Sequence, residues 1–195
     1  ALRTDTVDRI LDLAERLVQT RGFNGFSYAD VAAGLGVTKA SLHYHFATKA
    51  DLGHRLIERY GEGFAVALTA IDRETADAPE RLRRYAAIYA DVLRADRMCL
   101  CGMLAADYAT LPAPMRDGVR RFFDLNESWL ARTLEGGRSA GTLRFDGPAT
   151  EVARLLVGSL EGAMLVARTY GDPSSVAAAA ARILADLEPA PRLAA

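Results

Sequence analysis

The stretch that decides the fold is residues 32–52, which read AAGLGVTKASLHYHFATKADL. The spacing A-x3-G-V-T-x3-L runs through it from Ala32 to Leu42. A helix-turn-helix needs a small residue where its two helices cross, and Ala32 meets that need. Gly36 suits a turn with positive φ, where a Cβ is unfavourable. The full spacing therefore predicts a helix-turn-helix in preference to an ordinary helical hairpin with a glycine turn.

The charge of this stretch differs from that of the whole chain. The chain has 195 residues, with 24 basic and 25 acidic side chains and a net charge of −1. Residues 31–50 contain no Asp or Glu, and they hold the only two lysines, Lys39 and Lys49, together with His43 and His45. A nearly neutral protein meets the DNA backbone through a local cationic surface. We therefore expect this stretch to face a polyanion.

Composition and periodicity indicate an all-α protein. Apolar residues recur at helical spacing almost everywhere, and no alternating strand pattern is present. With 50% apolar and 25% charged residues, the chain is neither disordered nor fibrous. Cys99 and Cys101 are too few for a disulfide framework, which indicates a reducing compartment. Without an apolar run of about 20 residues or a signal peptide, we expect a cytoplasmic protein with no membrane partner.

The helical pattern predicts about nine helices and two domains. Residues 1–47 are expected to form a three-helix DNA-binding head, and residues 48–195 a larger helical body. After a first helix that carries Val7 to Val18, the expected helices are 28–34, 39–45, 48–72, 79–96, 101–109, 112–137, 148–170 and 174–187.

Residues 38–52, TKASLHYHFATKADL, resemble the signature of TetR-family transcriptional regulators, whose usual form ends in Tyr-x-His-Phe-x-x-Lys-x-x-Leu. The resemblance is strong over residues 6–55 and extends, as helix order, over the whole chain. It implies an all-α homodimer, in most members a repressor, with an N-terminal DNA-binding head and a C-terminal ligand-binding and dimerisation body. His43 departs from the family, which commonly has Tyr there. This affects the expected operator sequence and not the fold.

The resemblance and the helix-turn-helix together imply a set of DNA-binding residues. The first residues of the recognition helix are expected to face base edges, and Tyr44, His45 and Lys49 resemble the family's groove and phosphate contacts. Ser27 serves either as a helix cap alone or also as part of a phosphate site. Phe46 is expected in the core. The DNA-binding set is Ser27, Tyr28, Thr38, Lys39, Ala40, Ser41, His43, Tyr44, His45 and Lys49.

The body contains many aromatic and sulfur side chains, which are either ordinary core or the walls of the pocket that the resemblance implies. Polar residues on apolar stretches are expected to face a ligand or to pair with arginines such as Arg120 or Arg168. The expected ligand-binding set is Phe64, Tyr89, Cys101, Met103, Asp107, Asn126, Trp129 and Glu161. Two cysteines fall short of the four ligands of a zinc site, so we expect no metal and no cofactor.

Small residues on the last two helices predict either a four-helix dimer interface or close packing within one chain. The expected interface residues are Gly158, Gly162, Ala163 and Ala178.

These observations predict a transcriptional regulator, a repressor that binds a palindromic duplex operator as a homodimer and is released by a small-molecule inducer. In an alternative, the inducing signal is oxidation or alkylation of Cys99 or Cys101. An all-α enzyme is disfavoured because no catalytic constellation or phosphate loop is visible. A protein-interaction module is disfavoured by the acid-free, lysine-bearing recognition helix.

Overall fold

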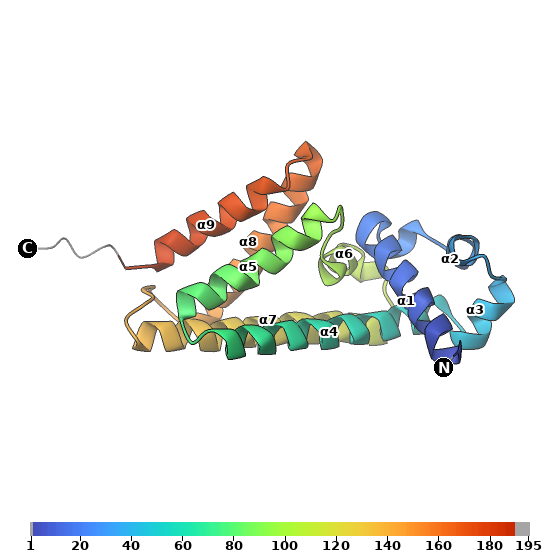
Figure 1. Cartoon of the computed structure of the whole chain (residues 1–195), viewed down its shortest axis with the longest axis horizontal. Coiled ribbons are helices and arrows are strands. Elements are labelled where there is room, and N and C mark those ends of the chain that lie inside the picture. The colour runs from blue at the N-terminus through green and yellow to red at the C-terminus, as the bar shows by residue number, and fades with distance from the viewer. Residues whose placement is uncertain (1, 190–195) are drawn as a thin grey trace, which may run out of the picture. The chain divides into compact units, whose positions relative to one another are not determined.

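The computed structural model describes residues 2–189, and all regular structure in this range is helical, which confirms the all-α prediction (Figure 1). The elements are α1 (Leu2–Arg21), η1 (Phe23–Gly25), α2 (Tyr28–Leu35), α3 (Lys39–His45), α4 (Lys49–Glu74), α5 (Ala78–Arg94), α6 (Leu100–Ala106), η2 (Tyr108–Thr110), α7 (Ala113–Ser139), α8 (Ala149–Tyr170) and α9 (Ser174–Leu187), where η marks a 3-10 helix.

The expected helices are present, and two of them, α5 and α6, end earlier than expected, α5 by two residues and α6 by three. Helix α6 was predicted to reach residue 109, but it ends at Ala106. The backbone N–H and the hydroxyl of Thr110 both donate to the carbonyl of Asp107, at 2.9 and 2.8 Å. These bonds span three residues, so the chain tightens into the 3-10 turn η2 in place of the last helical turn.

The chain forms two compact units. The first contains Ala1–Gly63 and Asp96–Phe123, and the second contains Phe64–Ala95 and Asp124–Ala195. Helices α4 and α7 each begin in the first unit and end in the second. The first unit therefore includes α6 and the start of α7 as well as the helix-turn-helix. The expected functional division after residue 47 stays a prediction.

The core of the first unit explains why three short helices can be stable together. Helices α2 and α3 have only eight and seven residues, too few to persist alone in water. Helix α2 packs against α1 and α3, and burial of apolar side chains in this unit supplies the stabilisation that the isolated helices lack. Phe46, at 7% exposure, lies in this core as expected. The other buried residues include Ile10, Ala14, Val18, Val31, Leu42, Leu52 and Leu56.

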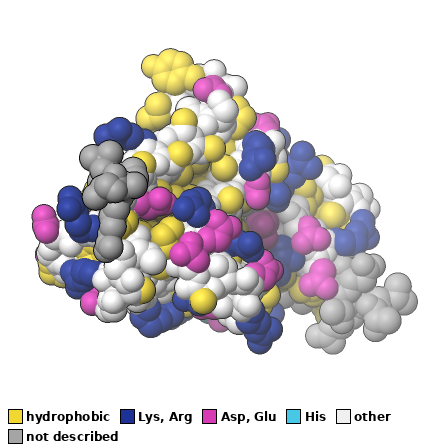
Figure 2. All heavy atoms as spheres, turned by 60° about the vertical axis from the view of Figure 1, so that its left-hand side comes forward, with side chains coloured by type: hydrophobic (Ala, Val, Ile, Leu, Met, Phe, Trp, Pro, Cys, Tyr) yellow, Lys and Arg dark blue, Asp and Glu magenta, His cyan; other side chains and the backbone are white. Residues whose placement is uncertain are grey.

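In the second unit, α5 packs against α8 and α9. Charged side chains of both signs are interspersed on the molecular surface, with apolar side chains visible between them (Figure 2). Within residues 2–189, no helix combines the length and the apolar character that a bilayer crossing requires.

Candidate functional site

The turn between α2 and α3 has the predicted helix-turn-helix geometry. Gly36 adopts φ 67° and ψ 32°, a left-handed conformation that is unfavourable for residues with a Cβ. The Val37 N–H donates to the Ala32 carbonyl at 3.0 Å and closes the end of α2. Thr38 begins the next helix, because its Oγ1 accepts from the Ser41 N–H at 3.2 Å. Ala32 is buried, and the predicted roles of Ala32 and Gly36 are confirmed.

The N-terminus of α2 is closed by a capping box. The Ser27 N–H and the Ser27 hydroxyl both donate to Asp30 Oδ2 at 2.7 Å, and these bonds hold the pKa of Asp30 below its usual value. Ser27 as a helix cap is thus confirmed, and a phosphate contact at Ser27 stays a prediction.

Tyr28 does not present its hydroxyl to a phosphate. The hydroxyl donates to the Phe46 carbonyl at 2.9 Å and is buried. Burial, and secondarily the charge of Asp51, raises the pKa of Tyr28 to about 12. The hydroxyl therefore stays protonated and ties α2 to the end of α3. The Tyr28 side chain is thus engaged inside the protein, whereas a phosphate contact through the backbone N–H groups at this helix N-terminus stays a prediction.

Helix α3 presents a continuous exposed face. Lys39, Ala40, His43 and Tyr44 are exposed, and their spacing of one and four residues places them on one side of the helix. Tyr44 is 72% exposed. His45 is half-buried, and its ring meets the Tyr44 ring edge to face, with centroids 5.1 Å apart. This face contains donors, a cation and no carboxylate, as a DNA-reading surface requires.

Lys49 differs from its expected role. Its Nζ donates to the carbonyls of Phe23 and Phe26 and lies 4.5 and 4.1 Å from the centroids of the same two rings. Burial lowers the pKa of Lys49, although Asp107 and Asp30 oppose the shift. The ammonium group is therefore engaged inside the protein, and this geometry does not match the expected phosphate contact.

Asp107 is likewise engaged inside the protein. Its Oδ2 accepts from the backbone N–H groups of Phe23 and Asn24, at 2.9 and 3.4 Å, and the Asn24 side chain donates to Thr110 Oγ1 at 2.9 Å. Asp107 thus holds the turn η1 and does not pair with Arg120 or point to a ligand. Sequence reasoning missed this contact because the partners lie 84 and 83 residues away.

Four of the expected ligand-binding residues meet in the second unit, around Tyr85. The Tyr85 hydroxyl donates to Asn126 Oδ1 at 2.8 Å and lies 3.0 Å from the Tyr89 hydroxyl. Its ring stacks on Trp129 with centroids 5.7 Å apart and meets the edge of Phe64 at 6.1 Å. Asn126 is fully buried. Its partner is Tyr85, whereas the sequence had offered an arginine as the alternative to a ligand.

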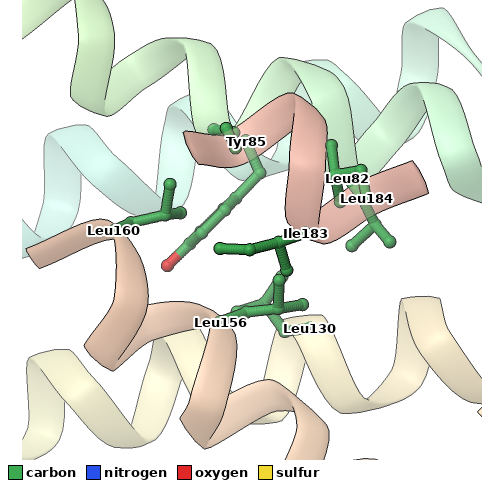
Figure 3. Close-up of a pocket in the computed structure, with 9 residues that line it drawn as sticks. Leu82, Tyr85, Leu130, Leu156, Leu160, Ile183 and Leu184 are labelled. Atoms are coloured by element: carbon green, nitrogen blue, oxygen red, sulfur yellow. The ribbon is translucent and has the colours of Figure 1, made fainter. Parts of the chain in front are cut away.

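Little free space remains in the interior beside Tyr85, whose side chain lies among leucines and Ile183 (Figure 3). A pocket there is lined by α5, α7, α8 and α9, with Leu82, Leu130, Leu156 and Leu160 among its walls. Its free volume is about 10 Å³, room for about one water molecule. A ligand among these side chains would have to displace some of them. A larger open groove of about 290 Å³, walled mainly by alanines, lies between α5 and α9.

The remaining expected ligand residues lie elsewhere. Cys101 is buried, and Met103 is half-buried; both belong to the first unit with Asp107, whereas Glu161 is half-buried on α8. Cys99 and Cys101 are both buried thiols, and the Tyr60 hydroxyl donates to Cys99 Sγ at 3.8 Å. Burial raises the pKa of Tyr60 well above its usual value. Residues 2–189 contain no cluster of three metal-ligating side chains.

Helix α8 carries an exposed apolar face that includes two of the expected dimer residues. A Cβ added at Gly158 or Gly162 would meet no atom within 4 Å, so close packing within the chain does not explain these glycines. Ala178 is exposed on α9, and Ala163 is half-buried. The large apolar side chains exposed on α8 are Leu155, Leu165, Val166 and Tyr170.

Comparison with known proteins agrees with this geometry. A family model described as bacterial regulatory proteins, tetR family, matches residues 10–56, and a model described as the tetracyclin repressor-like C-terminal domain matches residues 78–183. A solved TetR-family transcriptional regulator from Agrobacterium tumefaciens superposes with a TM-score of 0.92 and 30% identity, over 95% of this chain and 99% of that one.

Two curated proteins are similar over most of their length. The HTH-type transcriptional repressor DhaR of Mycobacterium sp. (strain GP1) is 23% identical over 164 residues, which are 84% of this chain and 82% of DhaR. The transcriptional regulator AcuR of Cereibacter sphaeroides is 28% identical over 155 residues, which are 76% of this chain and 69% of AcuR.

A helix-turn-helix with an acid-free recognition helix, followed by a helical body, defines a DNA-binding transcriptional regulator. The chain belongs to the TetR family. This confirms the resemblance carried by residues 38–52. The family is one of regulators and not of enzymes, so the enzyme alternative is set aside.

Proposed function

We propose that this protein is a ligand-responsive repressor that binds a palindromic operator as a homodimer. The observation that carries the proposal is the exposed face of α3, where Lys39, Ala40, His43 and Tyr44 lie together without a carboxylate. A recognition helix of this kind enters the major groove, and phosphate contacts at its flanks set its register. In this proposal residues 1–47 form the DNA-binding domain and residues 48–195 the ligand-binding and dimerisation domain.

The homodimer is supported by α8. Its exposed apolar face offers Leu155, Leu165 and Val166 beside two glycines that leave room for a partner helix. Exposed apolar surface of this kind is typical of protein interfaces. Two heads on one dimer would match two half-sites about 34–36 Å apart, or a multiple of that distance.

The inducer is proposed to bind in the body, with the cluster around Tyr85 as its main contact. Aromatic rings with two hydroxyls and one amide suit an apolar ligand with a small number of polar groups. Because the free space there is only about 10 Å³, the ligand would favour an arrangement with more room, and only such differential affinity can shift the DNA-binding equilibrium. The signal through Cys99 or Cys101 is less well supported, since both thiols are buried.

The experiment is a mobility-shift titration of the purified protein with duplex DNA taken from the regions flanking its gene. We expect a specific shift whose affinity falls steeply as salt rises, because phosphate contacts release counterions. Random duplex of the same length is the control. Equal affinity for all duplexes, or no shift at low salt, would contradict the proposal.

A further inference from the structure

His43 is held in one orientation by two contacts. Its Nδ1 lies 3.0 Å from the Ala47 carbonyl oxygen, and its ring packs on the Tyr28 ring with centroids 4.8 Å apart and a tilt of 56°. The Tyr28 ring is itself fixed, because its hydroxyl is bonded to the Phe46 carbonyl. The imidazole is therefore positioned before any DNA is present.

The contact with Ala47 determines which nitrogen of His43 carries the proton. A carbonyl oxygen only accepts hydrogen bonds, so Nδ1 must be the donor. In the neutral imidazole, Nε2 is then an acceptor with its lone pair outward. The side chain is exposed, and no bond to Nε2 from the described residues is present. A tyrosine at this position would present a hydroxyl, which both donates and accepts. His43 presents an acceptor alone.

An outward acceptor restricts what His43 can contact on a duplex. Phosphate oxygens are acceptors, and so are guanine N7 and O6 and thymine O4. The donors in the major groove are the N6 amino group of adenine and the N4 amino group of cytosine. We propose that His43 is a specificity-determining residue, an inference that rests on the proposed operator binding. Its Nε2 accepts a hydrogen bond from the amino group of adenine or cytosine and disfavours guanine and thymine at the contacted base.

This contact predicts a distinctive base preference in the operator. At one position of each half-site, the strand that His43 contacts should carry A or C and exclude G and T. Each base pair holds one amino and one keto base, so the preference is for the orientation of the pair and not for its composition. A lysine or a protonated imidazole, as a donor, would show the opposite preference.

The test is selection of bound duplexes from a random library at pH 8, where imidazole is neutral, followed by sequencing. Wild-type protein is expected to favour A or C over G or T at one half-site position by about three- to tenfold, the range of a single net hydrogen bond. His43→Gln places an amide near Nε2 and should keep a preference for adenine there. His43→Asn reaches only the Nδ1 position and should lose the preference at that position alone. His43→Lys should invert it toward guanine.

His54→Asn, which changes a histidine of α4 outside the recognition helix, is the matched control and should leave the profile unchanged. Circular dichroism melting checks that each variant is folded. A wild-type preference for G or T, or identical profiles for wild type and His43→Asn, would overturn the role of His43 while leaving operator binding intact. If no duplex is enriched by the folded wild-type protein, the proposed function itself is wrong.

Discussion

At the scale of the residue, the two lysines of this chain have opposite surroundings. Lys39 is exposed on α3, whereas the Lys49 ammonium group is bonded to two carbonyls and lies over two rings. Both stand in the acid-free stretch, where Lys39 was expected to face base edges and Lys49 to contact a phosphate. Their geometry separates a lysine that faces solvent from one that holds the turn η1 against α4.

We therefore expect Lys49→Ala and Lys39→Ala to act on different quantities. Lys49→Ala leaves two carbonyls without their donor and should lower the free energy of unfolding by about 2 kcal/mol. Lys39→Ala should change stability by less than about 0.5 kcal/mol and lower the salt slope of DNA binding by about one per protomer. Urea unfolding measures the change in stability, and a titration of DNA affinity against salt concentration measures the change in salt slope. A reduced salt slope with unchanged stability in Lys49→Ala would restore its phosphate role.

The lowered pKa of Asp30 predicts how the stability of the protein depends on pH. Bonds from Ser27 lower the pKa of this carboxyl in the folded protein, so its contribution to stability is present above the ordinary aspartate pKa of about 3.9 and is lost as pH falls through the lowered value. An NMR titration of the Ser27 amide should show a midpoint below about 3.9. In Asp30→Asn the same resonance should not titrate. A midpoint at or above the ordinary value would show that the capping box is absent in solution.

At the scale of the element, the turn η1 is held from two sides within the first unit. The Asp107 carboxylate accepts from its N–H groups, and the Lys49 ammonium donates to its carbonyl at Phe23. The turn joins α1 to α2. Glycine is needed at its start, since Gly22 adopts φ 80° and ψ 164°, a conformation that is essentially glycine-only.

Removing the carboxylate should loosen this turn. Asp107→Ala is expected to lower the free energy of unfolding by about 1.5–3 kcal/mol, because it removes a charged acceptor from two amides. Hydrogen exchange at the amides of Phe23 and Asn24 should accelerate more than at Val31 in α2. The control is Asp117→Ala, an exposed carboxylate on α7 with a long 3.8 Å ion pair. Unchanged exchange in Asp107→Ala would mean that the turn does not depend on Asp107.

At the scale of the whole molecule, the prediction concerns assembly. Gly162 lies on the outer face of α8 with open space around it, so a larger side chain there should be tolerated by the monomer and should obstruct a partner helix. We expect Gly162→Leu to melt within a few degrees of the wild type, to sediment as a monomer at micromolar concentration, and to lose most of its operator affinity.

Gly136→Leu is the control for this variant. It also places leucine at a helical glycine of the second unit with open space, but on α7, away from the α8 face. It should remain dimeric. A wild-type protein that sediments as a monomer, or a Gly162→Leu variant that remains a dimer, would show that the interface lies elsewhere.

Local features of this protein followed from its sequence alone. The helix-turn-helix, the glycine at Gly36 and the cap at Ser27 all depend on residues within a few positions of one another. Hydrogen bonds between residues three or four positions apart, and apolar spacing along one helix, can be predicted directly from the order of residues. The helix boundaries were predictable for the same reason, and the end of α6 was missed because η2 replaced its last turn.

What only the tertiary structure decided is where the polar side chains point. Lys49, Asp107, Tyr28 and Asn126 were all expected to meet DNA or a ligand, and each has a partner inside the protein that is 18 to 84 residues away in sequence. A polar side chain near the core loses its bonds to water and must replace them, and its partner is whichever group the fold brings within about 3 Å. Periodicity predicts that such a residue needs a partner, but only the packing of distant helices determines which partner it has.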